Sequence, residues 1–263
     1  MALTLATAMQ GIVRSGARAF IPFLTGGYPD PVTFGALLHA SRCADFIEVG
    51  LPFSDPVADG PSICHASDVA LGAGMNAGAL FELLARQRGL PALILMTYLN
   101  PVLAFGPRRF MRAAAQVGVR GIILTDLPPE DGAELLAEAA AHDIASVLLV
   151  APTTSDARIA TIASHSTGFV YCIAVKGTTG ARQEVGELAE RTVGRVRAVS
   201  SQPVVVGFGI STPEHVRSTC RFADGVVVGS ALVDLVREHG ASDDLVQRFA
   251  ARVQEFAAAA HVG

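Results

Sequence analysis

The segment Phe46-Ile-Glu-Val-Gly50 is a short apolar run with one carboxylate, and the proline-rich loop Leu-Pro-Phe-Ser-Asp-Pro-Val-Ala-Asp-Gly-Pro follows it over residues 51–61. Similar runs recur along the chain, from Ala19 to Leu24, Leu93 to Met96, Gly121 to Thr125, Ala145 to Val150, Phe169 to Ile173, Val204 to Phe208 and Val226 to Val228. These runs are continuously hydrophobic, which is typical of parallel strands covered on both faces. The sequence therefore predicts eight parallel strands.

Segments with apolar residues at helical spacing separate these strands. They run from Ala2 to Val13, Pro31 to Arg42, Ala79 to Arg88, Pro107 to Val117, Glu130 to His142, Asp156 to His165, Glu187 to Val199 and Pro213 to Cys220. Asp30, Ser155 and Thr212 stand where helix N-caps are expected. The alternation has no linker or change of composition, and it predicts an α/β fold: a single (β/α)8 barrel of the TIM type with additional helices, one domain over residues 1–263. A doubly wound open sheet is the alternative.

The composition excludes several classes of protein. The chain has 263 residues, 51% of them hydrophobic, and 20 Lys and Arg residues against 24 Asp and Glu residues give a net charge of -4. This hydrophobic content excludes a disordered chain, and the charge balance offers no basic surface for nucleic acid. The uncharged stretch from Gly89 to Pro107 contains three prolines, so it is interpreted as a strand plus a loop and not as a membrane span. Residues Ala2 to Val13 lack the pattern of a signal peptide, and a cytoplasmic protein is expected.

The cysteines and histidines show no metal-binding pattern. The four cysteines form no CxxC pair and lie in apolar surroundings, so buried and reduced thiols are expected at Cys43, Cys64, Cys172 and Cys220. The seven histidines form neither HxH nor HExxH and are expected at the surface. No metal site is predicted, which argues against a metal hydrolase.

Carboxylates mark the end of the second predicted strand. Glu48 lies within an apolar strand, where a charge is costly to bury, so it is a candidate for acid–base catalysis; an edge position with the side chain in solvent is the alternative. Asp55 and Asp59 lie in the loop that follows, where turn formation is the alternative to a functional role. Active sites of (β/α)8 barrels lie at this end of the strands. The strand and loop together are therefore a candidate active site.

Glycine-rich turns follow the last three predicted strands. They are Gly177-Thr-Thr-Gly180, Gly207-Phe-Gly-Ile-Ser211 and Gly229-Ser230, the last of which opens a helix. Glycine lets backbone amides approach an anion, and the positive end of a helix dipole favours negative charge. Barrels frequently bind phosphate after strands seven and eight, so a phosphate site is expected there; tight turns alone are the alternative.

The segment from Phe46 to Pro61 closely resembles the signature of the tryptophan synthase alpha subunit family. Further similar segments follow in the order of the family, from about Phe20 to Ser230. They are Pro22-Phe23, Thr25-Gly-Gly-Tyr-Pro29, Leu95-Met-Thr-Tyr98, Asn100-Pro101, Asp126-Leu-Pro-Pro-Glu130, Ala151-Pro-Thr-Thr154 and the three glycine turns. The resemblance implies retro-aldol cleavage of indole-3-glycerol phosphate to indole and glyceraldehyde 3-phosphate, with no cofactor in this chain.

The resemblance also implies roles for particular residues. Glu48 matches the general acid/base, and Asp59 matches the carboxylate that hydrogen-bonds the indole N–H. The loop from Gly177 to Gly180 resembles a loop that closes over the substrate, with Thr179 contacting the region of Asp59. The remaining substrate-binding residues are aromatic walls and a phosphate cradle: Phe23, Tyr98, Tyr171 and Phe208 for the indole, and Gly180, Gly209, Gly229 and Ser230 for the phosphate.

The family further implies a partner. Its members usually pair with a beta subunit that carries pyridoxal phosphate and converts indole and serine to tryptophan, in an alpha2beta2 tetramer. The segments expected to contact the partner are Pro52 to Gly60, Asn100 to Pro101 and the region around Pro128-Pro129.

Some residues depart from the family pattern. Cys64 replaces the usual Gln, Ala174 stands where Ser is common, and Lys176 and Thr178 replace a small residue and Val in the closing loop. A free-standing lyase that releases indole without a beta subunit is therefore the alternative, and ordinary drift in a tolerant loop is the simpler explanation. Lys176 could add a cation near the phosphate, in which case Lys176→Ala would raise the KM for the substrate.

Two other classes of function share parts of this pattern. A phosphate-binding isomerase barrel would share the glycine turns but not the loop with Glu48 and Asp59, and assays on isomerase substrates would separate the two. A non-catalytic scaffold would keep the fold, and a substrate left intact with and without a beta subunit would favour it. The presence of both carboxylates argues against the scaffold.

Overall fold

The computed structural model describes residues 4–173, 182–207, 209–240 and 242–261. Within these ranges the chain forms nine strands. They are β1 (Ala19–Thr25), β2 (Phe46–Gly50), β3 (Ala92–Thr97), β4 (Val119–Leu124), β5 (Ala145–Ser146), β6 (Leu148–Val150), β7 (Val170–Ile173), β8 (Val204–Gly207) and β9 (Gly225–Val228).

The strands close into a barrel. Their order is β5-β4-β3-β2-β1-β9-β8-β7-β6, and neighbouring strands pair in parallel. The first and last members, β5 and β6, are two pieces of one stretch of chain separated by Val147, whose N–H donates to the carbonyl of Ile122 at 3.0 Å. The prediction of eight parallel strands in a barrel is confirmed, with the fifth strand divided in two. An open doubly wound sheet is excluded because its two edges would not meet.

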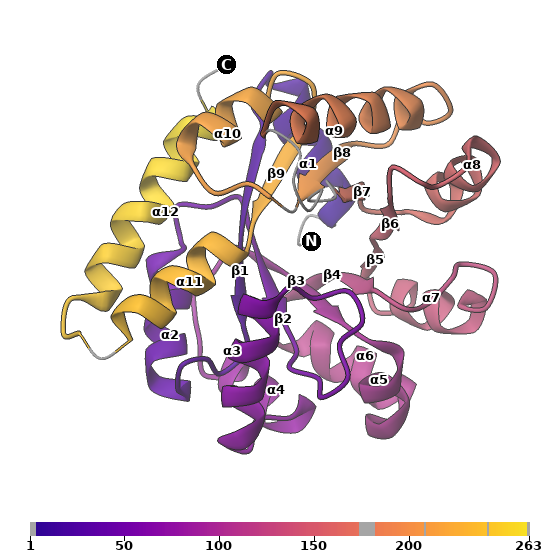
Figure 1. Ribbon diagram of the computed structural model, residues 1–263. Helices are drawn as coiled ribbons and strands as arrows, with labels where there is room; N and C mark the ends of the chain where they lie inside the picture. Colours follow the sequence, from indigo (N-terminus) through magenta and orange to yellow (C-terminus); the bar gives the residue numbers. More distant parts are fainter. Residues whose placement is uncertain (1–3, 174–181, 208, 241, 262–263) are drawn as a thin grey trace.

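All of the described helices except the first lie around the outside of the strands (Figure 1). The described helices are α1 (Leu5–Arg14), α2 (Pro31–Ala40), α3 (Pro61–Gly72), α4 (Ala77–Ala85), α5 (Leu99–Phe105), α6 (Pro107–Gln116), α7 (Ala133–Ala140), α8 (Asp156–His165), α9 (Arg182–Arg197), α10 (Pro213–Thr219), α11 (Ser230–His239) and α12 (Leu245–His261). None of the helices in the described part of the chain is long and apolar enough to cross a membrane.

The predicted N-caps are present. The Asp30 carboxylate accepts hydrogen bonds from the N–H groups of Val32 and Thr33 at 2.9 and 3.0 Å, which satisfies two donors at the start of α2. Ser155 and Thr212 cap α8 and α10 in the same way. The interpretation of Gly89 to Pro107 as a strand plus a loop was half wrong, because α5 follows β3 directly.

The floor of the barrel is closed by the first helix. A Cβ atom on Gly121 would lie 2.5 Å from a methyl group of Leu5, and one on Gly168 would lie 2.9 Å from the same methyl. Leu5 is 1% exposed, and the absence of side chains at these two glycines leaves room for it. Helix α1 therefore packs into the end of the barrel opposite the strand ends that carry the candidate site.

The expected burial of the cysteines and the expected exposure of the histidines were partly wrong. Cys172 and Cys220 are buried, but Cys43 is exposed in the turn after α2, and Cys64 is only partly buried near the start of α3. His39 is only partly exposed, and its Nδ1 atom is buried. The prediction failed at Cys64 because this residue lies on α3, a helix that was not predicted after the proline-rich loop.

Candidate active site

Glu48 points into the barrel from β2. It lies opposite Phe23 of β1 in the strand register and is 1% exposed, so the interpretation as an exposed edge residue was wrong. Burial raises the pKa of Glu48 to about 8, and the negative charge of Asp59 contributes to the rise. The charge of Glu48 in turn acts on Tyr171 of β7, on the far side of the barrel interior. Its Oε2 atom has no hydrogen-bond partner among the described residues.

Asp59 lies in the loop between β2 and α3, and the structure brings it close to Glu48. Burial raises the pKa of Asp59 to about 6, and a hydrogen bond from the Tyr98 hydroxyl opposes this rise. Its Oδ1 atom is buried and has no hydrogen-bond partner within the described ranges. Asp55, by contrast, is exposed and accepts a hydrogen bond from Ser54 at 2.6 Å, as expected of a turn residue.

Tyr98 connects this loop to the end of β3. The residue is 2% exposed at the start of α5, and its hydroxyl accepts a hydrogen bond from the backbone N–H of Ala58 at 3.1 Å. Its ring packs on Phe53 with the ring centroids 5.1 Å apart. The aromatic side chain therefore holds the loop at two points in addition to its contact with Asp59.

Phe23 and Tyr171 form apolar walls around Glu48. Both are almost fully buried, Phe23 on β1 and Tyr171 on β7. A Cβ atom on Gly207 of β8 would lie 2.0 Å from the Tyr171 hydroxyl, so glycine is required there by the position of the Tyr171 ring. This dependence was not predicted from the sequence, where Gly207 was assigned to a phosphate-binding turn.

The glycine turns after β8 and β9 lie at the same end of the barrel. Gly209 adopts a φ of 78°, and Gly229 precedes α11 without a side chain that caps the helix. A Cβ atom on Gly229 would lie 3.6 Å from Phe23, which places this turn beside the aromatic wall. The uncapped first turn of α11, beginning at Ser230, is suited to an anion.

A hydrogen bond joins the two ends of the site. The Ser62 hydroxyl, three residues after Asp59, donates to Asp234 Oδ1 on α11 at 2.7 Å. Asp234 also forms an ion pair with Arg237 at 2.9 Å. The helix that starts at Ser230 is thereby attached to the segment that carries Asp59, a connection that no motif in the sequence indicated.

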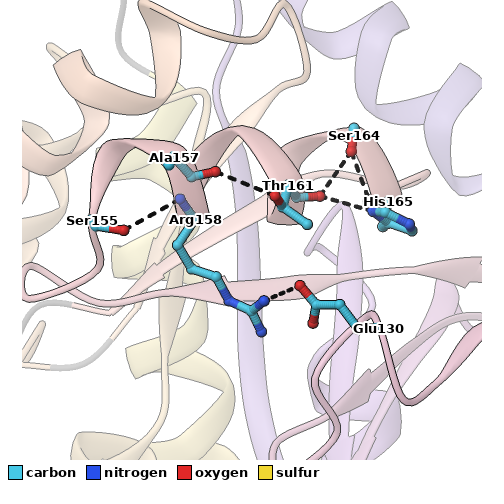
Figure 2. A network of polar contacts seen from close by, with 7 residues as sticks. All are labelled: Glu130, Ser155, Ala157, Arg158, Thr161, Ser164 and His165. Carbon is cyan, nitrogen blue, oxygen red and sulfur yellow. Dashed lines mark hydrogen bonds and ion pairs between the residues drawn. The ribbon is translucent and has the colours of Figure 1, made fainter.

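The loop after β4 is also anchored. Asp126 accepts a hydrogen bond from the backbone N–H of Leu99 at 2.7 Å. Glu130 forms an ion pair with Arg158, which reaches down from α8 (Figure 2). Pro128 and Pro129 lie between these anchors and line a cleft of about 260 Å³.

Some predicted site residues lie outside the described ranges: Thr179, Gly180 and Phe208, together with the departures Ala174, Lys176 and Thr178. One residue to which the sequence analysis gave no role lies inside the site. Thr25, the last residue of β1, is 3% exposed, and its hydroxyl has no hydrogen-bond partner in the described part of the chain. Thr25 opens the segment Thr25-Gly-Gly-Tyr-Pro29, which resembles the family, but that resemblance assigned the threonine no function.

The arrangement combines three chemical capacities. A carboxyl that keeps its proton near neutral pH lies close to a second carboxyl of lower pKa, so one can act as an acid while the other carries a negative charge. Aromatic side chains offer flat apolar surfaces, and an uncapped helix start offers backbone donors. Within the described residues, no group of three or more His, Cys, Asp and Glu side chains could hold a metal ion.

Comparisons with known proteins show which family the chain resembles. A family model described as tryptophan synthase alpha chain matches residues 9–261. The tryptophan synthase alpha chain of Deinococcus radiodurans is 44% identical over 237 residues, which cover 87% of each chain. A crystal structure of the tryptophan synthase alpha chain from Legionella pneumophila superposes with a TM-score of 0.87 at 31% identity, over 98% of this chain and 97% of that one. A chain in a structure of Mycobacterium tuberculosis tryptophan synthase gives a TM-score of 0.88 at 36% identity, with 100% of both chains covered.

Proposed function

The chain belongs to the tryptophan synthase alpha chain family, and from this premise we propose how its own residues perform the reaction. It is a lyase that cleaves indole-3-glycerol phosphate to indole and glyceraldehyde 3-phosphate. Pyridoxal phosphate belongs to the beta subunit of the family, and the alpha reaction needs no cofactor. The observation that carries the proposal is a fully buried carboxyl, Glu48, beside a second carboxyl, Asp59, at the carboxyl ends of the strands.

Glu48 is the general acid and base. Cleavage of the bond between indole C3 and the glycerol chain requires a proton on C3 and the removal of a proton from the chain hydroxyl next to that bond. With a pKa of about 8, Glu48 is protonated at neutral pH and can donate to C3. Its carboxylate then takes the proton of the chain hydroxyl as the aldehyde forms.

Asp59 stabilises the indole ring during this step. Protonation of C3 places positive charge on the ring nitrogen, and an ionised carboxylate that accepts a hydrogen bond from the ring N–H offsets this charge. The hydrogen bond from Tyr98 favours the ionised form of Asp59. Phe23, Tyr98, Tyr171 and Phe208 contact the ring, while Thr179, Gly180, Gly209, Gly229 and Ser230 contact the phosphate end or close over the substrate.

The partner is a tryptophan synthase beta subunit, in an alpha2beta2 tetramer. Two large apolar side chains support this assignment: Val57 in the Asp59 loop is 83% exposed, and Leu103 on α5 is 53% exposed. They lie in or beside segments where the family resemblance predicts partner contact, and exposed apolar residues are typical of interaction surfaces. We further propose one barrel domain over residues 1–263 and a cytoplasmic location.

The test is an assay of the purified chain with indole-3-glycerol phosphate, alone and with a beta subunit, in which indole and glyceraldehyde 3-phosphate are measured. We expect slow cleavage alone and strong acceleration by the partner, with activity lost in Glu48→Gln. Fast cleavage that the partner does not change would instead identify a free-standing lyase. Full activity in Glu48→Gln would refute the assignment of the acid.

A further inference from the structure

Three polar atoms in the mouth of the barrel are buried without a partner among the described residues: Thr25 Oγ1, Glu48 Oε2 and Asp59 Oδ1. The two carboxyls have roles in the proposed reaction, but the Thr25 hydroxyl has none. A buried hydroxyl without a hydrogen bond destabilises the folded protein. Its presence beside the reacting groups therefore calls for a ligand that satisfies it.

The register of the strands places the Thr25 side chain inside the barrel. Thr25 pairs with Gly50, and Phe23 pairs with Glu48, so each pair has its side chains on one face of the sheet. Residues two apart on a strand share a face, and adjacent residues face opposite sides. The side of Gly26 is covered by α4, because a Cβ atom on Gly26 would lie 2.9 Å from Leu80. Thr25 thus lies on the interior face, one layer closer to the strand ends than Phe23 and Glu48.

Strand β1 lies between β2, which leads to Asp59, and β9, which leads to Gly229, so Thr25 lies between the groups proposed to hold the two ends of the substrate. Phe23 forms the aromatic wall and also lies beside Gly229, where the phosphate is expected. The glycerol chain, which carries two hydroxyl groups, must connect the ring to the phosphate close to Glu48. A threonine hydroxyl can donate to and accept from a substrate hydroxyl, whereas an aromatic wall cannot.

We propose that Thr25 is a substrate-contacting residue whose hydroxyl forms a hydrogen bond with a hydroxyl of the glycerol chain. This inference rests on the proposed function, because it concerns the same substrate. It assigns Thr25 to recognition of the chain, while the ring and the phosphate are recognised by other residues. A site that is built to bond a substrate hydroxyl discriminates against an analogue that lacks it.

The test compares Thr25→Val, which has nearly the same shape without the hydroxyl, with Thr25→Ser, which keeps the hydroxyl. For each protein, kcat and KM are measured with indole-3-glycerol phosphate, and Kd is measured with indole-3-propanol phosphate, which lacks the chain hydroxyls. We expect kcat/KM to fall about tenfold in Thr25→Val and about twofold or less in Thr25→Ser. The affinity for the analogue should stay within about twofold in both variants.

Thermal unfolding provides the control for a structural role. Because the Thr25 hydroxyl has no partner within the described residues, Thr25→Val should unfold at the same temperature as the wild type or higher. An equal loss for substrate and analogue, or no loss for either, would overturn the proposal. A wild-type chain that binds the analogue but cleaves no substrate would instead refute the proposed function.

Discussion

Glu48→Gln should stabilise the protein while abolishing its activity, and the gain should depend on pH. Burial raises the pKa of Glu48 from 4.5 to about 8, so the folded protein holds this proton more tightly than the unfolded chain. Stability must then fall as pH rises from about 4.5 to about 8, because over that range the unfolded chain releases this proton while the folded protein keeps it. Glutamine has a similar shape and cannot ionise, so the variant avoids this loss.

The size of the effect follows from the shift. One pKa unit corresponds to about 1.4 kcal/mol, so the shift lowers the stability of the fold, relative to its stability at low pH, by about 1 kcal/mol at pH 5, about 3 kcal/mol at pH 7 and nearly 5 kcal/mol at pH 9. The stability of Glu48→Gln relative to the wild type should therefore increase by about 4 kcal/mol from pH 5 to pH 9. For a chain of this length, that corresponds to a difference in Tm of roughly 8–16 °C.

Urea unfolding of both proteins at pH 5, 7 and 9 measures this difference directly. Glu134→Gln is a matched control, because Glu134 is exposed on α7 and its replacement removes a carboxyl without changing the barrel interior. If the stability difference between Glu48→Gln and the wild type is the same at all three pH values, the carboxyl is not protonated in the fold. The assignment of Glu48 as an acid at neutral pH would then be wrong.

Three further predictions concern the site. The pH profile of kcat/KM should be bell-shaped, since Asp59 loses its charge as pH falls through about 6 and Glu48 loses its proton as pH rises through about 8; a flat profile from pH 5 to 9 would contradict this. Tyr98→Phe removes a hydrogen bond that lowers the pKa of Asp59, so the acidic limb of the profile should move to higher pH, whereas a purely structural role would leave it in place. Gly207→Ala places a Cβ atom 2.0 Å from the Tyr171 hydroxyl and should lower the free energy of unfolding, measured in urea, by about 1–3 kcal/mol. Adding Tyr171→Phe to this variant should recover only part of the loss, because the ring carbon would still lie 2.5 Å from the new Cβ atom.

The strands of this fold were predictable because their signal is local. Continuous apolar runs such as Leu93 to Met96 appear in the sequence whether or not the barrel is known, and each became a strand. Helices α3 and α5 were missed because their prolines suggested loops, although Pro61 occupies the first helical position, where its missing N–H costs nothing. The division of the fifth strand at Val147 depends on the closure of the barrel, and no residue pattern in the sequence predicts it.

The residues of the site also differ in whether their signal is local in the sequence or depends on the folded structure. Glu48 stood out in the sequence because a carboxylate within an apolar strand is unusual in itself, whereas the role expected of Asp59 came from the family resemblance. Thr25 was quoted only as part of a segment similar to the family and received no role, since threonine is common in strands and the pairing with Gly50 is needed to show which way its side chain points. The contact between Gly207 and Tyr171 could not be predicted either, because the two residues lie on neighbouring strands that are far apart in the sequence.

The packing of Leu5 against Gly121 and Gly168 closes one end of the barrel, so the interior is reached only from the end that carries the candidate site. Both fragments of the substrate must leave by the route through which the substrate entered, so they compete with the next substrate molecule for the same passage. A protein docked over this end of the barrel could therefore retain the apolar fragment while the charged one escapes, without altering a single reacting group.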